Sequence, residues 1–190
     1  MQIESLYSET GVLIDGLKLI KPIVRKDHRG FFMESWNKKS LIEAGVGNID
    51  FVQDNHSQSN KGVFRGLHYQ LPPHPQSKLV RCIIGEIFDI AVDIRKKSKT
   101  FGKWVGVYLT ENNQQQLWVP EGFAHGFFTL SAKAEVLYKV TDYWDADCER
   151  TISWKDPSLS IKNPLDNNLK VSDKDSNAPF LSELKDSDIF

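Results

Sequence analysis

Apolar and polar residues alternate with a period of two along most of the chain. In the stretch 87–95, apolar residues at 88, 90, 92 and 94 alternate with small or polar residues at 89, 91, 93 and 95. This period is typical of a β-strand that turns one face towards an apolar core. Similar short runs, separated by turn signals, predict further strands at residues 30–36, 50–57, 62–70, 78–84, 103–109, 116–119, 124–130 and 135–143.

Helical signals are few. The segment from Asn37 to Gly45 opens with a residue type that caps helices and closes on glycine, which predicts one short helix at the periphery. The chain after Trp154 is polar and carries prolines at 157, 164 and 179, so loops and short turns are expected there. Many short, regularly spaced strands predict an all-β protein, a double-sheet jelly roll that forms a single domain over residues 1–190 with a few short peripheral helices.

Composition narrows the class of protein. The 190 residues include 24 Lys and Arg against 25 Asp and Glu, which excludes the basic excess of a nucleic-acid-binding surface. No apolar stretch approaches the roughly 18 residues of a membrane span, and the first residues lack the basic and apolar regions of a signal peptide. The two cysteines, Cys82 and Cys148, fit neither a disulfide framework nor a zinc ribbon. We therefore expect a cytoplasmic protein with no nucleic-acid or membrane partner.

The sequence lacks the common motifs of catalytic and metal sites. The five histidines never stand two or four residues apart, so no strand or helix offers a face with two histidine ligands for a metal. The chain has no glycine-rich phosphate loop, no G-x-S-x-G elbow and no signature of a Cys/His nucleophile. We expect neither a metal nor a cofactor.

Some polar residues lie within predicted strands, where a plain core would use apolar ones. Arg65 and His68 share one strand, and strict alternation puts them on opposite faces unless Gly66 allows a bulge. Asp54 and His56 interrupt another strand and are candidates for structural partners that orient His68 or a neighbouring residue. Other charged residues lie on two inner strands. They are candidates for a buried ion network made by Arg81, Asp89, Asp93 and Arg95.

Two further strand residues combine an apolar setting with a polar group. Tyr138 shares a face with Val136 and Val140, and Lys78 begins a strand that reads as buried. Each has an ordinary structural explanation, because a tyrosine in apolar company is commonly part of the core and a lysine commonly extends its ammonium group to water. Spacing alone indicates only a barrel opening lined by Arg, His, Lys, Gln, Asn and Tyr, which suits an anionic, hydroxylated ligand.

Six motifs follow one another along the chain: Asp27–Ser35, Phe51–Ser57, Arg65–Gln70, Lys78–Arg81, Pro120–Phe127 and Leu137–Lys139. In this order they closely resemble the signature of the dTDP-4-dehydrorhamnose 3,5-epimerases, and the likeness runs collinearly from about Leu17 to Leu181. The resemblance implies a cupin-like jelly roll that works as a homodimer without a metal. It also implies the conversion of dTDP-4-dehydro-6-deoxy-D-glucose into dTDP-4-dehydro-L-rhamnose, in the formation of dTDP-L-rhamnose.

The resemblance also implies catalytic roles. The C4 ketone of such a substrate acidifies the C–H bonds at C3 and C5, so inversion needs a base on one face and an acid on the other. By similarity His68 is the base, oriented by Asp175, and Tyr138 returns the proton from the opposite face. Lys78 would lie near the C4 oxygen, where a cation stabilises the enolate.

Further family positions imply substrate binding. The guanidinium groups of Arg29 and Arg65 suit a diphosphate, while the amides of Gln53 and Asn55 suit a thymine edge or sugar hydroxyls. In the family, N-terminal segments reach the partner subunit's site, so Arg29 and Glu34 are candidates for action across the dimer. The remaining binding positions implied by similarity are His125, Glu149 and Lys174.

Two alternatives of different kinds remain open. A relative acting on a similar nucleotide sugar could invert only C3 or only C5, or act as a ketoisomerase, although the presence of Tyr138 favours full inversion. A lectin-like binding module with the same fold would bind the nucleotide sugar without exchanging its protons with solvent. Nothing would then require His68, Lys78 and Tyr138 together.

Overall fold

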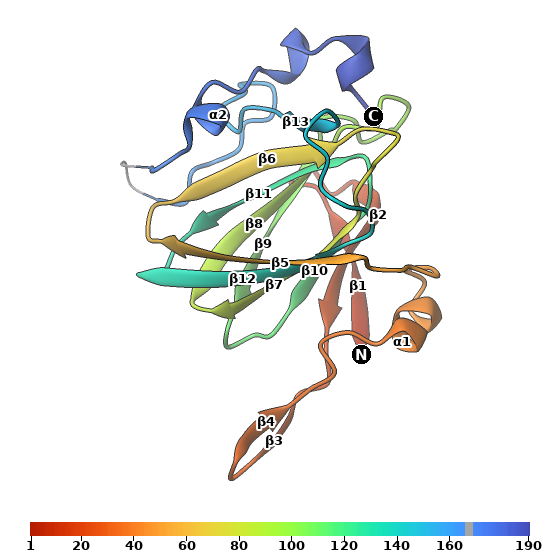
Figure 1. Ribbon diagram of the computed structural model, residues 1–190, viewed down its shortest axis with the longest axis vertical. Helices are drawn as coiled ribbons and strands as arrows, with labels where there is room; N and C mark the ends of the chain where they lie inside the picture. Colours follow the sequence, from red (N-terminus) through yellow and green to blue (C-terminus); the bar gives the residue numbers. More distant parts are fainter. Residues whose placement is uncertain (166–168) are drawn as a thin grey trace.

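Two antiparallel sheets packed face to face form the body of the protein (Figure 1), in a computed structural model that describes residues 1–165 and 169–190. This arrangement confirms the predicted all-β jelly roll. The six-stranded sheet has the order β1 (Gln2–Tyr7), β2 (Leu13–Lys21), β10 (Gln116–Val119), β7 (Lys78–Ile84), β12 (Lys133–Val140) and β5 (Gln53–Asn60). The five-stranded sheet has the order β13 (Glu149–Thr151), β6 (Phe64–Gln70), β11 (Phe123–Thr129), β8 (Glu86–Asp93) and β9 (Trp104–Thr110).

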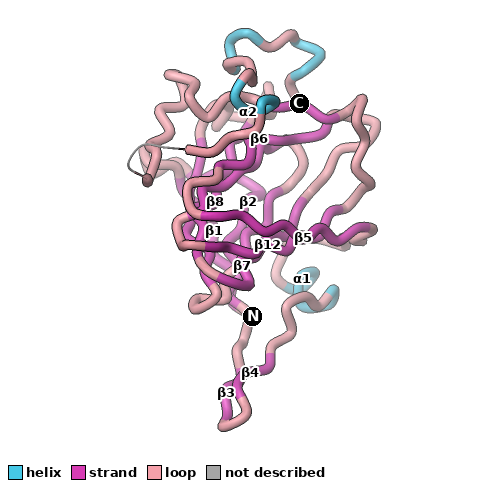
Figure 2. Tube along the Cα trace, turned by 60° about the vertical axis from the view of Figure 1, so that its left-hand side comes forward, coloured by secondary structure: helices cyan, strands magenta, loops and turns pink. Residues whose placement is uncertain are grey.

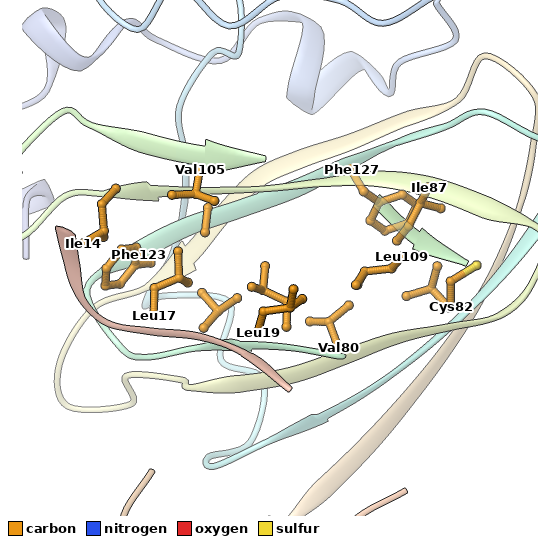
Figure 3. Close-up of a cluster of buried hydrophobic side chains, with 14 of the residues drawn as sticks. Ile14, Leu17, Leu19, Val80, Cys82, Ile87, Val105, Leu109, Phe123 and Phe127 are labelled. Carbon is orange, nitrogen blue, oxygen red and sulfur yellow. The ribbon is translucent and has the colours of Figure 1, made fainter. Parts of the chain in front are cut away.

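The space between the sheets is filled by alternate residues of nearly all the long strands (Figure 3). Leu17 and Leu19 of β2 line this interior from one sheet, Ile87 of β8 and Phe127 of β11 line it from the other, and Val80 of β7 is fully buried. Since successive strand residues point to opposite faces, the period of two in the sequence is the direct cause of this layer.

Two further apolar clusters cover the outer faces of the sheets. Phe64 and Phe128 lie outside the five-stranded sheet, under a lid that includes Leu159 and Leu181 of the C-terminal region. On the six-stranded sheet, Leu41 of α1 (Lys38–Glu43) packs against Trp118. The predicted helix is therefore confirmed, and the Asn37 side chain caps it by accepting a hydrogen bond from the backbone N–H of residue 40 at 3.1 Å.

The pattern of apolar and polar residues predicts the central strands correctly but misses most of the N-terminal ones. Of the predicted strand 30–36 only β4 (Gly30–Phe32) exists, and it pairs with β3 (Arg25–Asp27) in a hairpin that projects away from both sheets (Figures 1 and 2). Strands β1, β2, β3 and β13 were not predicted. The strand expected at 50–57 runs instead over 53–60, and the one expected at 135–143 ends at Val140 because the chain turns into a polar loop there.

A bulge in β6 decides which side chains reach the site. Arg65 is paired with Phe127 and His68 with His125, so β6 contains one residue more than β11 between these two pairs. Gly66 has a φ of +129° there, and a Cβ atom at this position would lie 2.5 Å from Cα of Gly126. The conditional prediction of a bulge at Gly66 is confirmed, and Arg65 and His68 consequently share a face.

The C-terminal region is mostly loop, as predicted, with three short helical turns: α2 (Asp173–Ser176), η1 (Leu181–Glu183) and η2 (Asp186–Asp188). The turn α2 packs against β6 and is capped by Ser172, whose hydroxyl accepts a hydrogen bond from the backbone N–H of Asp175 at 3.2 Å. Across residues 1–165 and 169–190, none of the helices has the length and apolar character needed to span a membrane.

Candidate active site

A polar pocket opens where β5 and β12 of one sheet face β6 of the other. It lies at the ends of strands that carry most of the residues singled out in the sequence. Its lining consists of Gln53, Asn55, His68, Tyr69, Gln70, Gln76, Lys78, Tyr138, Trp144 and Glu149. The fold thus brings three of the four expected catalytic residues to one opening, and the fourth, Asp175, lies directly behind His68.

His68 and Asp175 form a hydrogen-bonded pair. Nε2 of His68 lies 2.6 Å from Oδ1 of Asp175, which α2 delivers from 107 residues further along the chain. The Asp175 side chain is buried, whereas 31% of the His68 side chain is exposed. Burial acts to raise the pKa of the Asp175 carboxyl, but hydrogen bonds from His68, Gly66 and Ser172 outweigh it and hold that pKa below its usual range.

This pairing determines which nitrogen of the neutral His68 imidazole carries the proton. An ionised carboxylate can only accept hydrogen bonds, so Nε2 of His68 must carry the donated proton. The lone pair of the neutral ring then resides on Nδ1, the other nitrogen, which is the form that a general base requires. The alternative partners for His68 are wrong: His56 contacts Glu135 at 3.1 Å, and Asp54 pairs with Lys139 at 2.9 Å.

Lys78 brings a buried cation to the pocket. The residue is 7% exposed, and its Nζ donates a hydrogen bond to the backbone carbonyl of His68 at 3.3 Å. Burial lowers the pKa of Lys78 to about 8, an effect that the negative charges of Glu149 and Asp89 partly oppose. The ammonium group is therefore charged at neutral pH but poorly solvated, which strengthens its attraction for a nearby oxyanion.

Tyr138 presents a neutral phenol to the same pocket. It stands on β12, where its register partner on β5 is Asn55, and its body packs against the apolar interior. Burial raises the pKa of Tyr138, the positive charge of Arg65 opposes this, and the negative charge of Glu149 adds to it. The hydroxyl consequently keeps its proton at neutral pH and can donate it.

A second histidine–aspartate pair lies beside the first. His125 stands opposite His68 in the β6–β11 ladder, and its Nε2 is 2.8 Å from Oδ1 of Asp89. Both side chains are buried. Of the suggested ion network, Asp93 and Arg95 do pair, at 2.8 Å, whereas Asp89 is instead bonded to His125.

The amides of β5 form a short chain of hydrogen bonds at the pocket's edge. Nε2 of Gln53 donates to Oδ1 of Asn55 at 2.8 Å, and Oε1 of Gln53 accepts from the backbone N–H of Trp144 at 3.3 Å. The Trp144 side chain itself is 59% exposed. An exposed indole next to fixed amides is a surface on which a planar base can stack.

Charged residues frame the remaining side of the pocket. Glu149 of β13 forms an ion pair with Lys174 of α2. Arg65 donates a hydrogen bond from Nε to Oγ of Ser59 at 2.9 Å, which leaves its exposed guanidinium within electrostatic reach of Tyr138. Of these residues, Glu149 lines the pocket itself.

Two predicted binding residues lie apart from the pocket. Arg29 is at the turn of the β3–β4 hairpin, where its side chain is 78% exposed and pairs with Asp27 at 2.6 Å. Glu34 follows the hairpin and accepts a hydrogen bond from Nδ2 of Asn37 at 3.0 Å. The described chain therefore does not bring these two residues to its own pocket.

Sequence reasoning missed four pocket residues: Tyr69, Gln70, Gln76 and Trp144. Trp144 had a usable signal, since Tyr143 and Trp144 are adjacent aromatic residues in an otherwise polar stretch. Tyr69 and Gln70 belong to the motif Arg65–Gln70 but were given no role, and Gln76 had no signal because its place depends on loops that only the fold brings together. In the described parts of the chain, no group of three or more His, Cys, Asp or Glu side chains is arranged to hold a metal ion.

Comparison with known proteins agrees with this geometry. A dTDP-4-dehydrorhamnose 3,5-epimerase from Shigella flexneri is 54% identical over 177 residues, covering 93% of this chain and 96% of the relative. A crystal structure of a dTDP-6-deoxy-D-glucose-3,5-epimerase from Legionella pneumophila in complex with dTDP-4-keto-L-rhamnose superposes with a TM-score of 0.91 at 45% identity. The superposition covers 99% of this chain and 97% of the Legionella chain.

A 3'-monoepimerase from Streptomyces bikiniensis, solved in complex with dTDP-quinovose, is a more distant neighbour. It superposes with a TM-score of 0.84 at 30% identity, over 93% of this chain and 88% of that structure. A family model described as dTDP-4-dehydrorhamnose 3,5-epimerase matches residues 12–183. On these grounds the chain belongs to the dTDP-4-dehydrorhamnose 3,5-epimerase family.

Proposed function

We propose that this protein epimerises dTDP-4-dehydro-6-deoxy-D-glucose at C3 and C5, giving dTDP-4-dehydro-L-rhamnose for the formation of dTDP-L-rhamnose. The observation that carries the proposal is the convergence of the His68–Asp175 pair, Lys78 and Tyr138 on one pocket. The protein is accordingly an isomerase, and its substrate is a dTDP-sugar.

The first chemical step is proton removal by His68. Nδ1 of the ring accepts the proton from the carbon next to the C4 ketone, and the electron pair of that C–H bond moves into an enolate. The imidazolium that results is stabilised by the buried, ionised carboxylate of Asp175 at 2.6 Å. A positioned base of this kind is typically worth about 10²–10⁴-fold in rate.

The second step returns a proton to the opposite face. The charged ammonium group of Lys78 stabilises the enolate oxygen, and the phenol of Tyr138 donates its proton to the carbon. Proton transfer from the face opposite to His68 inverts the configuration. His68 then releases its proton to solvent and Tyr138 takes one up from solvent, so the same pair of groups serves C3 and C5 in turn, since both carbons flank the one ketone.

The other residues hold the nucleotide. Arg65 suits the diphosphate, the indole of Trp144 suits the thymine ring, and Gln53 and Asn55 suit its polar edge or the sugar hydroxyls. By family resemblance the buried His125 and the Glu149–Lys174 pair contact the substrate too.

We further propose that two copies of the chain, each a single domain over residues 1–190, form a homodimer. The β3–β4 hairpin exposes 56% of Phe31 and 68% of Phe32 and carries Arg29 away from its own pocket, which supports its insertion into a partner. Glu34, at the base of this hairpin, would travel with it. The buried free thiols of Cys82 and Cys148 support a reducing, cytoplasmic location.

Proton NMR of the dTDP-4-dehydro-6-deoxy sugar in D2O tests the activity directly. We expect the wild-type protein to introduce deuterium at both C3 and C5 and the His68→Ala variant to introduce none. A matched control is His56→Ala, because His56 is a histidine outside the pocket that contacts Glu135. Bound nucleotide sugar without any exchange would contradict the enzymatic proposal and leave a binding module.

One competing outcome has its own support. The Streptomyces bikiniensis neighbour, which shares this fold, is described as a 3'-monoepimerase, an activity at one carbon. Deuterium at C3 alone in the same NMR experiment would place the chain with such enzymes. The 54% identity to a 3,5-epimerase favours exchange at both carbons.

A further inference from the structure

The buried side chain of Gln70 joins the two loops at the mouth of the pocket, which are also linked through Asp142, by His74 at 3.0 Å and by the Gln76 amide at 2.8 Å. One loop connects β6 to β7 and contains His74; the other follows β12 and contains Tyr143, Trp144 and Asp145. Gln70 is the last residue of β6 and is 4% exposed, although its neighbourhood lies at the edge of an open pocket. A buried amide must satisfy its hydrogen-bonding groups within the protein.

The Gln70 amide forms hydrogen bonds with both loops. Its Nε2 donates to the backbone carbonyl of His74 at 2.7 Å and to that of Tyr143 at 3.1 Å. Its Oε1 accepts from the backbone N–H of Asp145 at 2.9 Å. Both N–H donors of the amide and its carbonyl are thus used, and all three partners are backbone groups.

The consequence concerns Trp144, which stands between the two residues that Gln70 holds. Its own backbone N–H donates to Oε1 of Gln53, so three successive residues of this loop are fixed by glutamine side chains. The indole nevertheless remains 59% exposed at the pocket. An aromatic face that is exposed to solvent but mounted on a fixed backbone is ready to bind a planar group without first being ordered.

We propose that Gln70 is a positioning residue for the nucleotide: it holds the backbone on both sides of Trp144 so that the indole is preorganised to receive the base. The inference rests on the proposed function, because it takes the occupant of the pocket to be a dTDP-sugar. It assigns to Gln70 an effect on binding and none on proton transfer.

Proton transfer is independent of Gln70 for a structural reason. His68 is oriented by Asp175 and by the ladders that join β6 to β11 and to β13. Neither contact uses the Gln70 side chain. Loss of its hydrogen bonds is therefore expected to raise KM while kcat at saturating substrate changes by less than about twofold.

The test is a double-mutant cycle on dTDP affinity, measured by calorimetry on the full-length protein. Gln70→Met keeps the side-chain volume but removes all three hydrogen bonds, and Trp144→Ala removes the indole. We expect each single substitution to raise the Kd for dTDP about tenfold, and the double variant to be no weaker than about the weaker single one. Non-additivity of this size means that Gln70 acts through Trp144.

Gln58→Met is the matched control, since Gln58 is an exposed glutamine of β5 whose side chain lies outside the pocket. It is expected to leave dTDP binding unchanged. If Gln70→Met does not fold, Gln70→Asn decides the matter: it retains a buried amide but is too short to reach both loops, so Kd should still rise severalfold.

Two results would overturn the inference while leaving the proposed function intact. One is unchanged dTDP affinity in the folded Gln70 variants; the other is an additive, roughly hundredfold loss in the double variant, which would mark Gln70 as a structural residue independent of Trp144. A wild-type protein that fails to bind dTDP or to exchange substrate protons would instead reject the proposed function itself.

Discussion

At the scale of single residues, burial changes the pKa of two groups in the site, lowering that of Lys78 and raising that of Tyr138. Lys78 is a cation in a place that disfavours charge, and burial lowers its pKa to about 8. In the proposed mechanism Lys78 stabilises an enolate, so activity is expected to depend on the fraction of Lys78 that is protonated. That fraction falls as the pH rises through 8, some two units earlier than for an exposed lysine.

We therefore expect kcat of the wild-type protein to decline above about pH 8 with a slope of one proton, and Lys78→Met to lower kcat by about 10²–10³-fold. Lys78→Arg provides the control, because a guanidinium group keeps its charge throughout this range. Its rate should be lower overall but independent of pH between 7 and 10. A wild-type profile that stays flat to pH 10 would rule out a buried, catalytic Lys78 cation.

The second residue-scale prediction separates removal of a proton from inversion of the carbon. In Tyr138→Phe the base His68 and the cation Lys78 remain, so C–H bonds still exchange with solvent, but the acid on the opposite face is lost. We expect deuterium incorporation in D2O to fall by less than about tenfold and formation of inverted product to fall by about 10²–10⁴-fold.

The measurement is NMR of substrate and product from a single reaction. Tyr143→Phe, which removes a 63% exposed phenol outside the pocket, should change neither rate. If exchange and inversion fall by the same factor in Tyr138→Phe, Tyr138 does not act as the separate acid.

At the scale of single elements, the β6 bulge is what places Arg65 and His68 on one face. Its cause is local: Gly66 has a φ of +129°, which L-residues with a side chain rarely adopt, and Gly126 packs directly against it. The Cβ of an alanine would lie 2.5 Å from Gly126 Cα and 2.8 Å from the carbonyl oxygen of His125. Backbone would have to move, and His125 and His68 would move with it.

Gly66→Ala should consequently destabilise the protein by about 2–4 kcal/mol and lower kcat together with it, as thermal unfolding and the NMR assay would show. Gly45→Ala is the matched control, because Gly45 has a φ of +76° but the Cβ of an alanine there would meet no heavy atom within 4 Å. That variant carries only the cost of the backbone conformation, about 1 kcal/mol, and should keep its activity. Equal effects in both variants would show that close packing at Gly66 is unimportant.

Some strands could be predicted from the sequence pattern alone, and others could not. Strands β7, β8 and β11 follow the period of two and were predicted within one or two residues. Strand β2 was missed although Leu17 and Leu19 alternate with polar residues, because Gly16 interrupts the run and glycine normally weakens a strand. Here a Cβ at Gly16 would lie only 3.1 Å from Cγ of Pro120, so glycine permits close packing between neighbouring segments.

At the scale of the whole molecule, the candidate site is an assembly of distant segments, and local patterns could not predict it. His68 meets an aspartate 107 residues away, and Gln70 joins two loops that follow different strands. The pairing of His68 with Asp175 was predictable only because whole motifs resemble those of a family. Gln70 closes the motif Arg65–Gln70, but its contacts with the two loops became visible only once the chain was folded.

In the proposed dimer, the place where the β3–β4 hairpin puts Arg29 can be tested with mixed dimers. If the β3–β4 hairpin of each subunit supplies Arg29 to its partner's pocket, every active site combines His68 of one chain with Arg29 of the other. The variants His68→Ala and Arg29→Ala are then each inactive or nearly so as homodimers. A mixed dimer contains one pocket with both defects and one pocket with neither.

Unfolding and refolding the two inactive variants together should therefore restore activity. Random pairing makes half of the dimers mixed, each with one intact site, so the recovered rate is about a quarter of that of the same amount of wild-type protein. Refolding either variant alone is the control and should restore nothing. If Arg29 instead folds back to serve its own pocket, every site in the mixture carries one defect, and activity stays at the level of the separate variants.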